Sequence, residues 1–239
     1  MARKNWITGL CAVALFLLPQ SAQAEKRKLL IGGFQDIVID GDMQVIITTG
    51  KGPSGNASGD RHILDLLRTD RVSDVMTIRL AQAPNNDNGK RTKQPLIVYL
   101  TNQNIRNITL VGNARLDINA IDNDGASRII VNGGGGVQIG KLTVDRLTVA
   151  MSGNGRVEFG GGNVRETILR IQGSPQYNGA LLQTRKFNLE LDGNAVVTAQ
   201  VDEGATISNE GSGNIVITGN AECLIRKAGS AVITCPNDK

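Results

Sequence analysis

Apolar and polar residues alternate along most of this chain, in short segments that meet at glycine-rich corners. Residues 147–151 and 157–159 each place apolar side chains at every second position. Alternation with a period of two predicts β-strands with one buried face. The connecting segment 152–155 reads Ser-Gly-Asn-Gly, residue types that accept positive φ. We therefore expect two short strands joined by a sharp corner.

This unit recurs along the chain at nearly even steps. Successive corner glycines are separated by 21, 20, 20, 20, 18 and 18 residues. A fixed period of roughly 20 to 50 residues indicates a solenoid or a related repeat array. The repeated corner residues are Gly112, Gly133, Gly153, Gly173, Gly193, Gly211 and Gly229. Aliphatic residues stand four positions before each glycine, and apolar residues stand four positions after it.

The period predicts an all-β fold, a right-handed parallel β-helix or β-solenoid with coils of about 20 residues. Equivalent residues of successive coils would stack about 4.8 Å apart. The right hand is expected by analogy with crossover connections in parallel sheets. An antiparallel sandwich of short strands is the alternative, but it does not require repeats that keep the same residue types at the same offsets.

We expect a single solenoid domain over residues 25–239. Residues 34–50 repeat the pattern around Gly41 and form the predicted first coil. Residues 51–95 interrupt the pattern, and regular coils follow over residues 96–239.

The interruption contains a short helix among strands and loops. Residues 50–59 read as a polar loop, and Asp60 is a candidate cap for a helix over residues 61–67. A helix here is suited to cover the open end of the core, where strand edges would otherwise be exposed. Residues 72–80 read as a strand, and residues 83–94 as a mobile exposed loop.

Four segments carry a resemblance to a known family. Residues 34–41, the pair Gly59-Asp60, residues 152–155 and residues 211–215 resemble the head GIN domain family of autotransporter adhesin heads. The resemblance spans nearly all of residues 25–239 and implies a β-helical, exported bacterial domain. The chain stops soon after the last repeat, so we expect no translocator barrel and no self-contained autotransporter.

The first 24 residues have the features of a cleaved signal peptide. A short basic start precedes an apolar run over residues 7–18, and Ala22-Gln23-Ala24 matches the small-x-small cleavage pattern. The apolar run is about 12 residues long, whereas a membrane span needs about 20. No second long apolar stretch follows. We expect an exported protein, either periplasmic or at the cell surface or secreted, with no transmembrane span after cleavage.

The charge and the aromatic content argue against nucleic acid as a partner. The signal segment holds two of the 26 basic residues and none of the 22 acidic ones, so the balance after cleavage is +2. No basic run is interleaved with aromatic residues, and Trp6 lies in the signal segment. Nucleic-acid surfaces combine basic stripes with aromatic stacking platforms.

The two cysteines that remain after cleavage predict a disulfide. Cys223 and Cys235 lie six residues before and six after Gly229, and exported proteins fold in oxidising surroundings. The closed loop would stabilise the terminal coil by about 3 kcal/mol. A pair of free buried thiols is the alternative. We expect no metal and no cofactor, since His62 is the only histidine.

One pair of carboxylates is a candidate for catalysis. Asp117 and Glu158 stand five residues after their glycines, in an outward column two coils apart. Their backbones would lie roughly 9–10 Å apart, at the upper edge for an inverting glycosidase. Polar side chains on a solvent-facing strand explain the pair equally well. Arg170 and Glu190, three residues before their glycines, are expected to pair across adjacent coils.

Three further motifs are weaker. Arg115 and Arg156 form either part of an anion-binding face or ordinary solvated surface. Residues 133–136 are four consecutive glycines, but no Lys-Ser/Thr pair follows, which favours a flexible corner over a phosphate loop. Residues 122–125 read Asp-Asn-Asp-Gly, yet the rest of a calcium loop is missing.

The sequence therefore favours an exported, non-enzymatic module of the bacterial cell envelope that binds a glycan or an envelope protein like an adhesin. Two alternatives remain. One is a polysaccharide-active lyase or hydrolase with Asp117 and Glu158 in its groove. The other is a structural envelope protein that forms homo-oligomers through its end coils.

Overall fold

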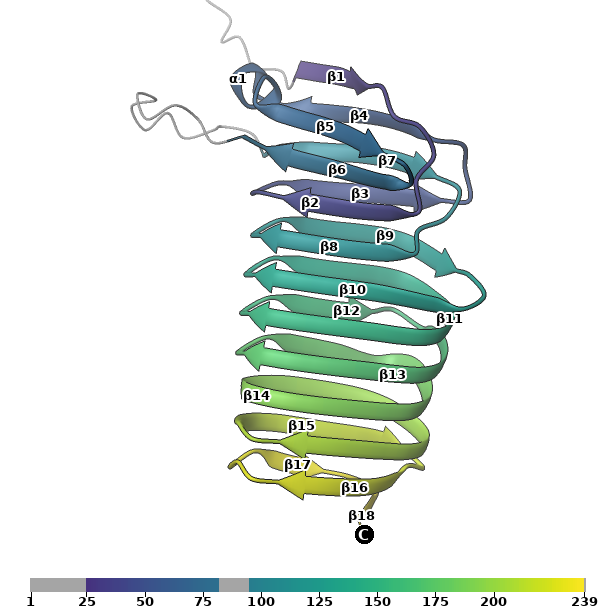
Figure 1. Cartoon of the computed structure of the whole chain (residues 1–239), viewed down its shortest axis with the longest axis vertical. Helices are drawn as coiled ribbons and strands as arrows, with labels where there is room; N and C mark the ends of the chain where they lie inside the picture. Colours follow the sequence, from purple (N-terminus) through teal and green to yellow (C-terminus); the bar gives the residue numbers. More distant parts are fainter. Residues whose placement is uncertain (1–24, 82–94, 239) are drawn as a thin grey trace, which may run out of the picture.

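The computed structural model describes residues 25–81 and 95–238, and these wind into a β-solenoid (Figure 1). The predicted signal segment and the predicted loop at 83–94 lie outside the described residues. The all-β solenoid prediction is confirmed, because the coils pair side by side in parallel. The hand of the coil stays a prediction. Within the described ranges, no helix is long and apolar enough to cross a membrane.

Each coil contributes one strand to each of two long faces. The pre-glycine face contains the strands that precede the corner glycines: β2 (Asp36–Asp40), β6 (Val75–Leu80), β8 (Asn107–Gly112), β10 (Ala126–Gly133), β13 (Gly162–Gly173), β16 (Glu222–Lys227) and parts of β11 (Gly136–Gly153) and β14 (Gln176–Asn209). The post-glycine face contains β3 (Gln44–Thr49), β7 (Ile97–Asn102), β9 (Arg115–Asp122), β12 (Arg156–Phe159), β15 (Ser212–Gly219), β17 (Val232–Thr234) and the remaining parts of β11 and β14. Long strands such as β14 continue around corners from one face to the other.

The corner glycines stack directly on one another and keep the coils in register. Gly112, Gly133 and Gly153 are paired from coil to coil. The later Gly211 and Gly229 do not have positive φ, but a Cβ on either would lie 1.9 Å from the carbonyl oxygen of the glycine one coil before. The corner therefore needs glycine for space as well as for backbone conformation.

The inward side chains of both faces form one continuous apolar core. Ladders of Ile, Val and Leu fill most of it. Three aromatic rings pack within it at tilted angles: the Phe159 and Tyr177 centroids are 5.7 Å apart, and those of Tyr177 and Phe187 are 6.2 Å apart. Burial raises the pKa of the Tyr177 hydroxyl well above its ordinary value.

The coil that comes first along the chain lies second in space. Strand β2 is paired with β6 on one side and β8 on the other, and β3 likewise lies between β7 and β9. The chain must therefore pass from β7 to β8 across the level of the earlier coil. Asn102, at the end of β7, is buried at this crossing. Its amide accepts a hydrogen bond from the Phe34 backbone N–H and donates to the carbonyl oxygens of Phe34 and Asn104.

The prediction of a polar loop at 50–59 is wrong, because residues 54–59 form strand β4 (Ser54–Gly59). This strand pairs antiparallel with β1 (Glu25–Leu29) and with β7. Its inward residues Gly55, Ala57 and Gly59 are small and buried, so the strand packs closely on its neighbours. This strand was not predicted, because glycine and serine are depleted in most strands.

The remaining part of the interruption covers the end of the solenoid (Figure 1). Helix α1 (Arg61–Leu64) is shorter than the expected 61–67, because Leu67 already begins β5 (Leu67–Val72), which pairs antiparallel with β6. Asp60 is the N-cap residue, but its side chain makes no capping hydrogen bond. A turn at Ser73 and Asp74 divides the strand expected at 72–80. Leu64 and Leu67 are buried against the end of the core.

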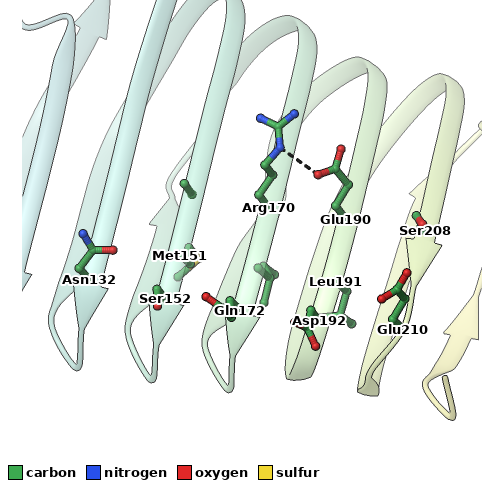
Figure 2. A pocket seen from close by; sticks show the side chains of 12 residues that line it. Asn132, Met151, Ser152, Arg170, Gln172, Glu190, Leu191, Asp192, Ser208 and Glu210 are labelled. Atoms are coloured by element: carbon green, nitrogen blue, oxygen red, sulfur yellow. Dashed lines mark hydrogen bonds and ion pairs between the residues drawn. The ribbon is translucent and has the colours of Figure 1, made fainter. Parts of the chain in front are cut away.

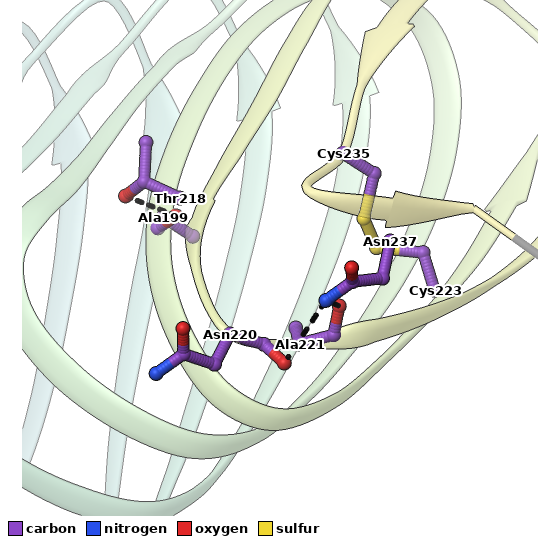
Figure 3. Close-up of a disulfide and its surroundings, with 7 residues drawn as sticks. All are labelled: Ala199, Thr218, Asn220, Ala221, Cys223, Cys235 and Asn237. Atoms are coloured by element: carbon purple, nitrogen blue, oxygen red, sulfur yellow. Dashed lines mark hydrogen bonds between the residues drawn. A yellow bond between two sulfur atoms is a disulfide. The ribbon is translucent and has the colours of Figure 1, made fainter.

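The predicted disulfide is confirmed in the last coil (Figure 3). Cys223 lies in β16, and Cys235 follows β17, so the bond joins the two faces of the coil. The two-residue strand β18 (Asn237–Asp238) then pairs with the start of β16. The side-chain amide of Asn237 donates to the carbonyl oxygens of Asn220 and Ala221, at 3.5 Å each.

Candidate functional site

The two carboxylates proposed for catalysis lie in one outward column but are not brought together. Gln138 stands between them, paired with Asp117 on one side and Glu158 on the other. Asp117 Oδ2 accepts a 2.9 Å hydrogen bond from Gln44, and Glu158 Oε1 accepts one of 3.4 Å from Asn178. Each carboxylate is thus held by an amide in the ladder, on a strand face that no hollow described below includes.

The two candidate anion-binding arginines are also separated. Gly136 lies between Arg115 and Arg156 in the register of the post-glycine face. The Arg156 guanidinium donates to the side-chain oxygen of Gln176 on the following coil. These contacts belong to the ladder of side chains along the surface, and they do not converge on one point.

The four-glycine segment uses its backbone amides within the fold. The N–H groups of Gly134 and Gly135 both donate to the Gly112 carbonyl oxygen, at 3.1 and 3.0 Å. The Gly136 N–H donates to the Ala114 carbonyl oxygen at 2.9 Å. Since these amides face the preceding coil, the segment is a corner and does not form a phosphate cradle.

Residues 122–125 lie at the second corner of their coil, beside a shallow hollow of about 450 Å³. Two arginines also line this hollow and are paired with carboxylates. Arg165 lies 3.4 Å from Asp145, and Arg185 Nε lies 2.7 Å from Glu203. Among the residues that the structure describes, no three His, Cys, Asp or Glu side chains are grouped so that they could hold a metal ion.

A surface hollow of about 540 Å³ lies on the pre-glycine face (Figure 2). It runs across five coils, and we call it the pre-glycine hollow. Its polar lining comes from two outward columns, one and three residues before the corner glycines: Asn132, Ser152, Arg170, Gln172, Glu190, Asp192, Ser208 and Glu210. The hollow exists because the short side chains Ala150, Ser152 and Ser208 stand beside much longer ones in these columns.

Arg170 and Glu190 form the expected ion pair across adjacent coils, with Arg170 Nε 2.9 Å from Glu190 Oε2 (Figure 2). More than half of each side chain is exposed, so the pair contributes little to stability. It instead fixes two charged groups at the edge of the hollow. One guanidinium and the three carboxylates of Glu190, Asp192 and Glu210 give the lining a net charge of −2.

This lining is suited to hydrogen bonding and does not assemble a catalytic set. Each coil contributes at least one amide, hydroxyl or carboxylate. Among the described lining residues, no hydroxyl is hydrogen-bonded to a histidine or a carboxylate, the contact that activates a nucleophile. His62, the only histidine of the chain, lies exposed on α1 at the covered end. The arrangement can hold a ligand along several coils.

This hollow was not predicted from the sequence. Its signal lies in the column three residues before the glycines, which reads Ile130, Ala150, Arg170, Glu190 and Ser208. Small residues flank a charged pair in that column. The hollow between these side chains can be recognised only when the coils are stacked in register.

A family model described as "Putative auto-transporter adhesin, head GIN domain" matches residues 33–221. The chain belongs to this family. The match covers most of the described coils, including both faces and the pre-glycine hollow. The resemblance noted in the sequence is thereby confirmed.

Solved structures share the fold of this head GIN domain protein at low sequence identity. A putative adhesin from Bacteroides fragilis is 18% identical, with a TM-score of 0.72 over 90% of this chain and 97% of that chain. A putative lipid binding protein from Parabacteroides distasonis is 17% identical, with a TM-score of 0.60 over 91% and 96%. A putative adhesin from Parabacteroides merdae is 14% identical, with a TM-score of 0.61 over 89% and 96%. A search of the curated proteins finds no match.

Proposed function

We propose that this head GIN domain protein is an exported, non-enzymatic binding module of the bacterial cell envelope that acts like an adhesin. Its family and two of the similar structures carry adhesin names. The disulfide supports export, since such bonds persist in oxidising compartments. The predicted signal peptide agrees with this location.

The observation that carries the proposal is the pre-glycine hollow itself. The hollow is open, and its lining offers groups that form hydrogen bonds. These polar groups repeat once per coil, so they are spaced by about 4.8 Å. A ligand that repeats along its own length, such as a glycan or an extended envelope protein, can meet the same kind of group on successive coils. The charged lining disfavours an acyl chain, which needs an apolar cavity.

The experiment measures binding of the purified protein to a panel of envelope polysaccharides, envelope proteins and lipid vesicles. Gln172→Ala alters the hollow, and Gln138→Ala removes a matched exposed glutamine from the opposite face. We expect saturable binding to a member of the panel, weakened about tenfold by Gln172→Ala, which equals about 1.4 kcal/mol. Gln138→Ala should bind like the wild type. Equal losses in both variants, or no binding to any member, would contradict the proposal.

A second role, homo-oligomerisation, is favoured by the last coil. In the described part of the chain, β17 pairs only with β15, and Val232 is 65% exposed at this edge. An open strand edge with apolar side chains is a template for pairing with another chain. Sedimentation of the wild type and of Val232→Lys at several concentrations tests this role. A wild type that stays monomeric would exclude it, and a dimer lost in Val232→Lys would support it.

A further inference from the structure

Tyr99 is the exposed aromatic residue of the described chain. The other four aromatic side chains, Phe34, Phe159, Tyr177 and Phe187, are at most 4% exposed, whereas Tyr99 is 41% exposed. It stands on β7 in the post-glycine face, near the covered end and away from the pre-glycine hollow. Exposed tyrosines on flat surfaces often anchor ligands, because the ring is rigid and offers both an apolar face and a polar hydroxyl.

The strand register places Tyr99 in the middle of a mixed surface. Its outward column crosses the five neighbouring strands β1, β4, β7, β3 and β9, in the order Lys28, Asn56, Tyr99, Ile46 and Asp117. A parallel column beside it reads Lys26, Ser58, Ile97, Gln44 and Arg115. We call these two columns, together with the adjacent Ser54 and Thr101, the Tyr99 surface.

Several polar groups of the Tyr99 surface are already held in place. Gln44 Nε2 donates to Asp117 at 2.9 Å. The hydroxyls of Ser54 and Thr101 lie 2.8 Å apart, and that of Thr101 donates to the Gly52 carbonyl oxygen at 2.6 Å. Groups that are fixed before binding lose little entropy when a ligand arrives.

The charge of the Tyr99 surface is opposite to that of the pre-glycine hollow. Lys26, Lys28 and Arg115 contribute three positive charges, and Asp117 contributes one negative charge, so the balance is +2. Complementary potentials steer association and select partners by charge. An anionic ligand is therefore favoured on this face.

We propose that the Tyr99 surface binds an acidic glycan, a chain of sugar rings that carry carboxylate or sulfate groups. The tyrosine ring packs on the apolar C–H face of one sugar. The ammonium groups of Lys26 and Lys28 pair with the acidic substituents, and Asn56 hydrogen-bonds to hydroxyls. The inference rests on the proposed binding function, but it concerns a face and residues that the hollow does not use.

The same surface fits other polyanions less well. Single-stranded nucleic acid binds where successive bases stack on several aromatic side chains, and this surface offers a single ring. Anionic lipid is held by clusters of four to eight basic residues, whereas this surface has three.

The test measures binding of the purified protein to immobilised polygalacturonate, a polymer of uronic acid. Tyr99→Ala removes the ring, and Tyr99→Phe keeps it. The pair Lys26→Gln/Lys28→Gln removes two positive charges from the surface. Arg128→Gln/Lys186→Gln removes the same charge from exposed positions on the pre-glycine face. Sulfated dextran, neutral dextran and single-stranded DNA of matched charge serve as competing ligands.

We expect polygalacturonate binding to fall about tenfold in Tyr99→Ala and in Lys26→Gln/Lys28→Gln, and less than about twofold in the other two variants. Sulfated dextran should compete, while neutral dextran and DNA should not. Tyr99→Ala that binds like the wild type, or DNA that competes equally, would overturn the proposal. Absence of polygalacturonate and sulfated dextran binding would also overturn it. Binding that depends on Gln172 would still stand in that case, so the two proposals fail separately.

Discussion

A Cβ atom on Gly193 would lie 2.1 Å from the carbonyl oxygen of Gly173, one coil before it. No side chain fits in that distance, and the obstacle is backbone that cannot move aside. Gly193 also has φ of +136°. At the glycine column, successive coils therefore lie too close together for a side chain, and the stacked glycines keep both faces in register.

Replacement of Gly193 by alanine should destabilise the protein strongly. The new methyl group clashes with backbone, and the φ value is strained for any L-residue, so we expect a loss of more than about 2 kcal/mol. Denaturant unfolding measures this loss. The control is Gly204→Ala in the same strand, where the nearest atom to a Cβ lies 3.9 Å away. That variant should be unchanged or slightly stabilised, and equal losses in both would contradict the account.

The repeat made the regular part of the fold predictable. Once Gly153, Gly173 and Gly193 are aligned, most apolar residues around them fall into inward columns, and Arg170 falls beside Glu190. The disulfide was predicted from the two cysteines that remain after cleavage and the oxidising surroundings of an exported protein, and the alignment placed both cysteines around Gly229. Local periodicity was sufficient here, since each coil contacts only its neighbours.

The covered end was not predictable in this way. The inward positions of strand β4 are occupied by small residues such as Gly55 and Ala57, which have little strand propensity. The position of β2 between β6 and β8 depends on pairing between segments far apart in the sequence. The repeat period also does not give the solvent exposure of a side chain. Tyr99 could therefore not be distinguished from a buried aromatic residue until β7 was placed in the sheet.

Removal of the Asn102 side-chain amide should destabilise the crossing of the chain from β7 to β8. Asn102→Ala leaves buried backbone groups of Phe34 without their partner, so we expect a loss of about 1–3 kcal/mol. The adjacent Gln103 is exposed, and Gln103→Ala should be near neutral. Unfolding midpoints of the two variants provide the comparison. A neutral Asn102→Ala would show that the amide does not hold the crossing.

Removal of the disulfide should loosen the last coil alone. Cys223→Ala/Cys235→Ala abolishes a loop closure worth about 3 kcal/mol in the chain-entropy estimate. Hydrogen exchange should accelerate in β16 and β17 and stay unchanged in β10 and β13, because stability in repeat folds is local. Faster exchange along the whole solenoid would mean that the bond stabilises the entire fold cooperatively.

The buried Tyr177 should make stability fall at alkaline pH. Burial raises its pKa above the ordinary value of 10.0. Above pH 10 an unfolded chain loses this proton while the folded one keeps it, so the free energy of unfolding falls by about 1.4 kcal/mol per pH unit. Tyr177→Phe removes this contribution. Unfolding measured from neutral pH to about pH 11 should give a shallower decline for the variant. Parallel declines would contradict the assigned burial effect.

Prolonged incubation with a bound polysaccharide shows directly whether the protein only holds its ligand or also transforms it. Each polysaccharide that the protein retains is incubated with it for many hours, released, and its chain-length distribution is compared with untreated material. For a non-enzymatic binding module, we expect complete recovery of unaltered chains. Shortened chains that form with the wild type, but not with Asp117→Ala/Glu158→Ala, would contradict the account and identify the protein as an enzyme.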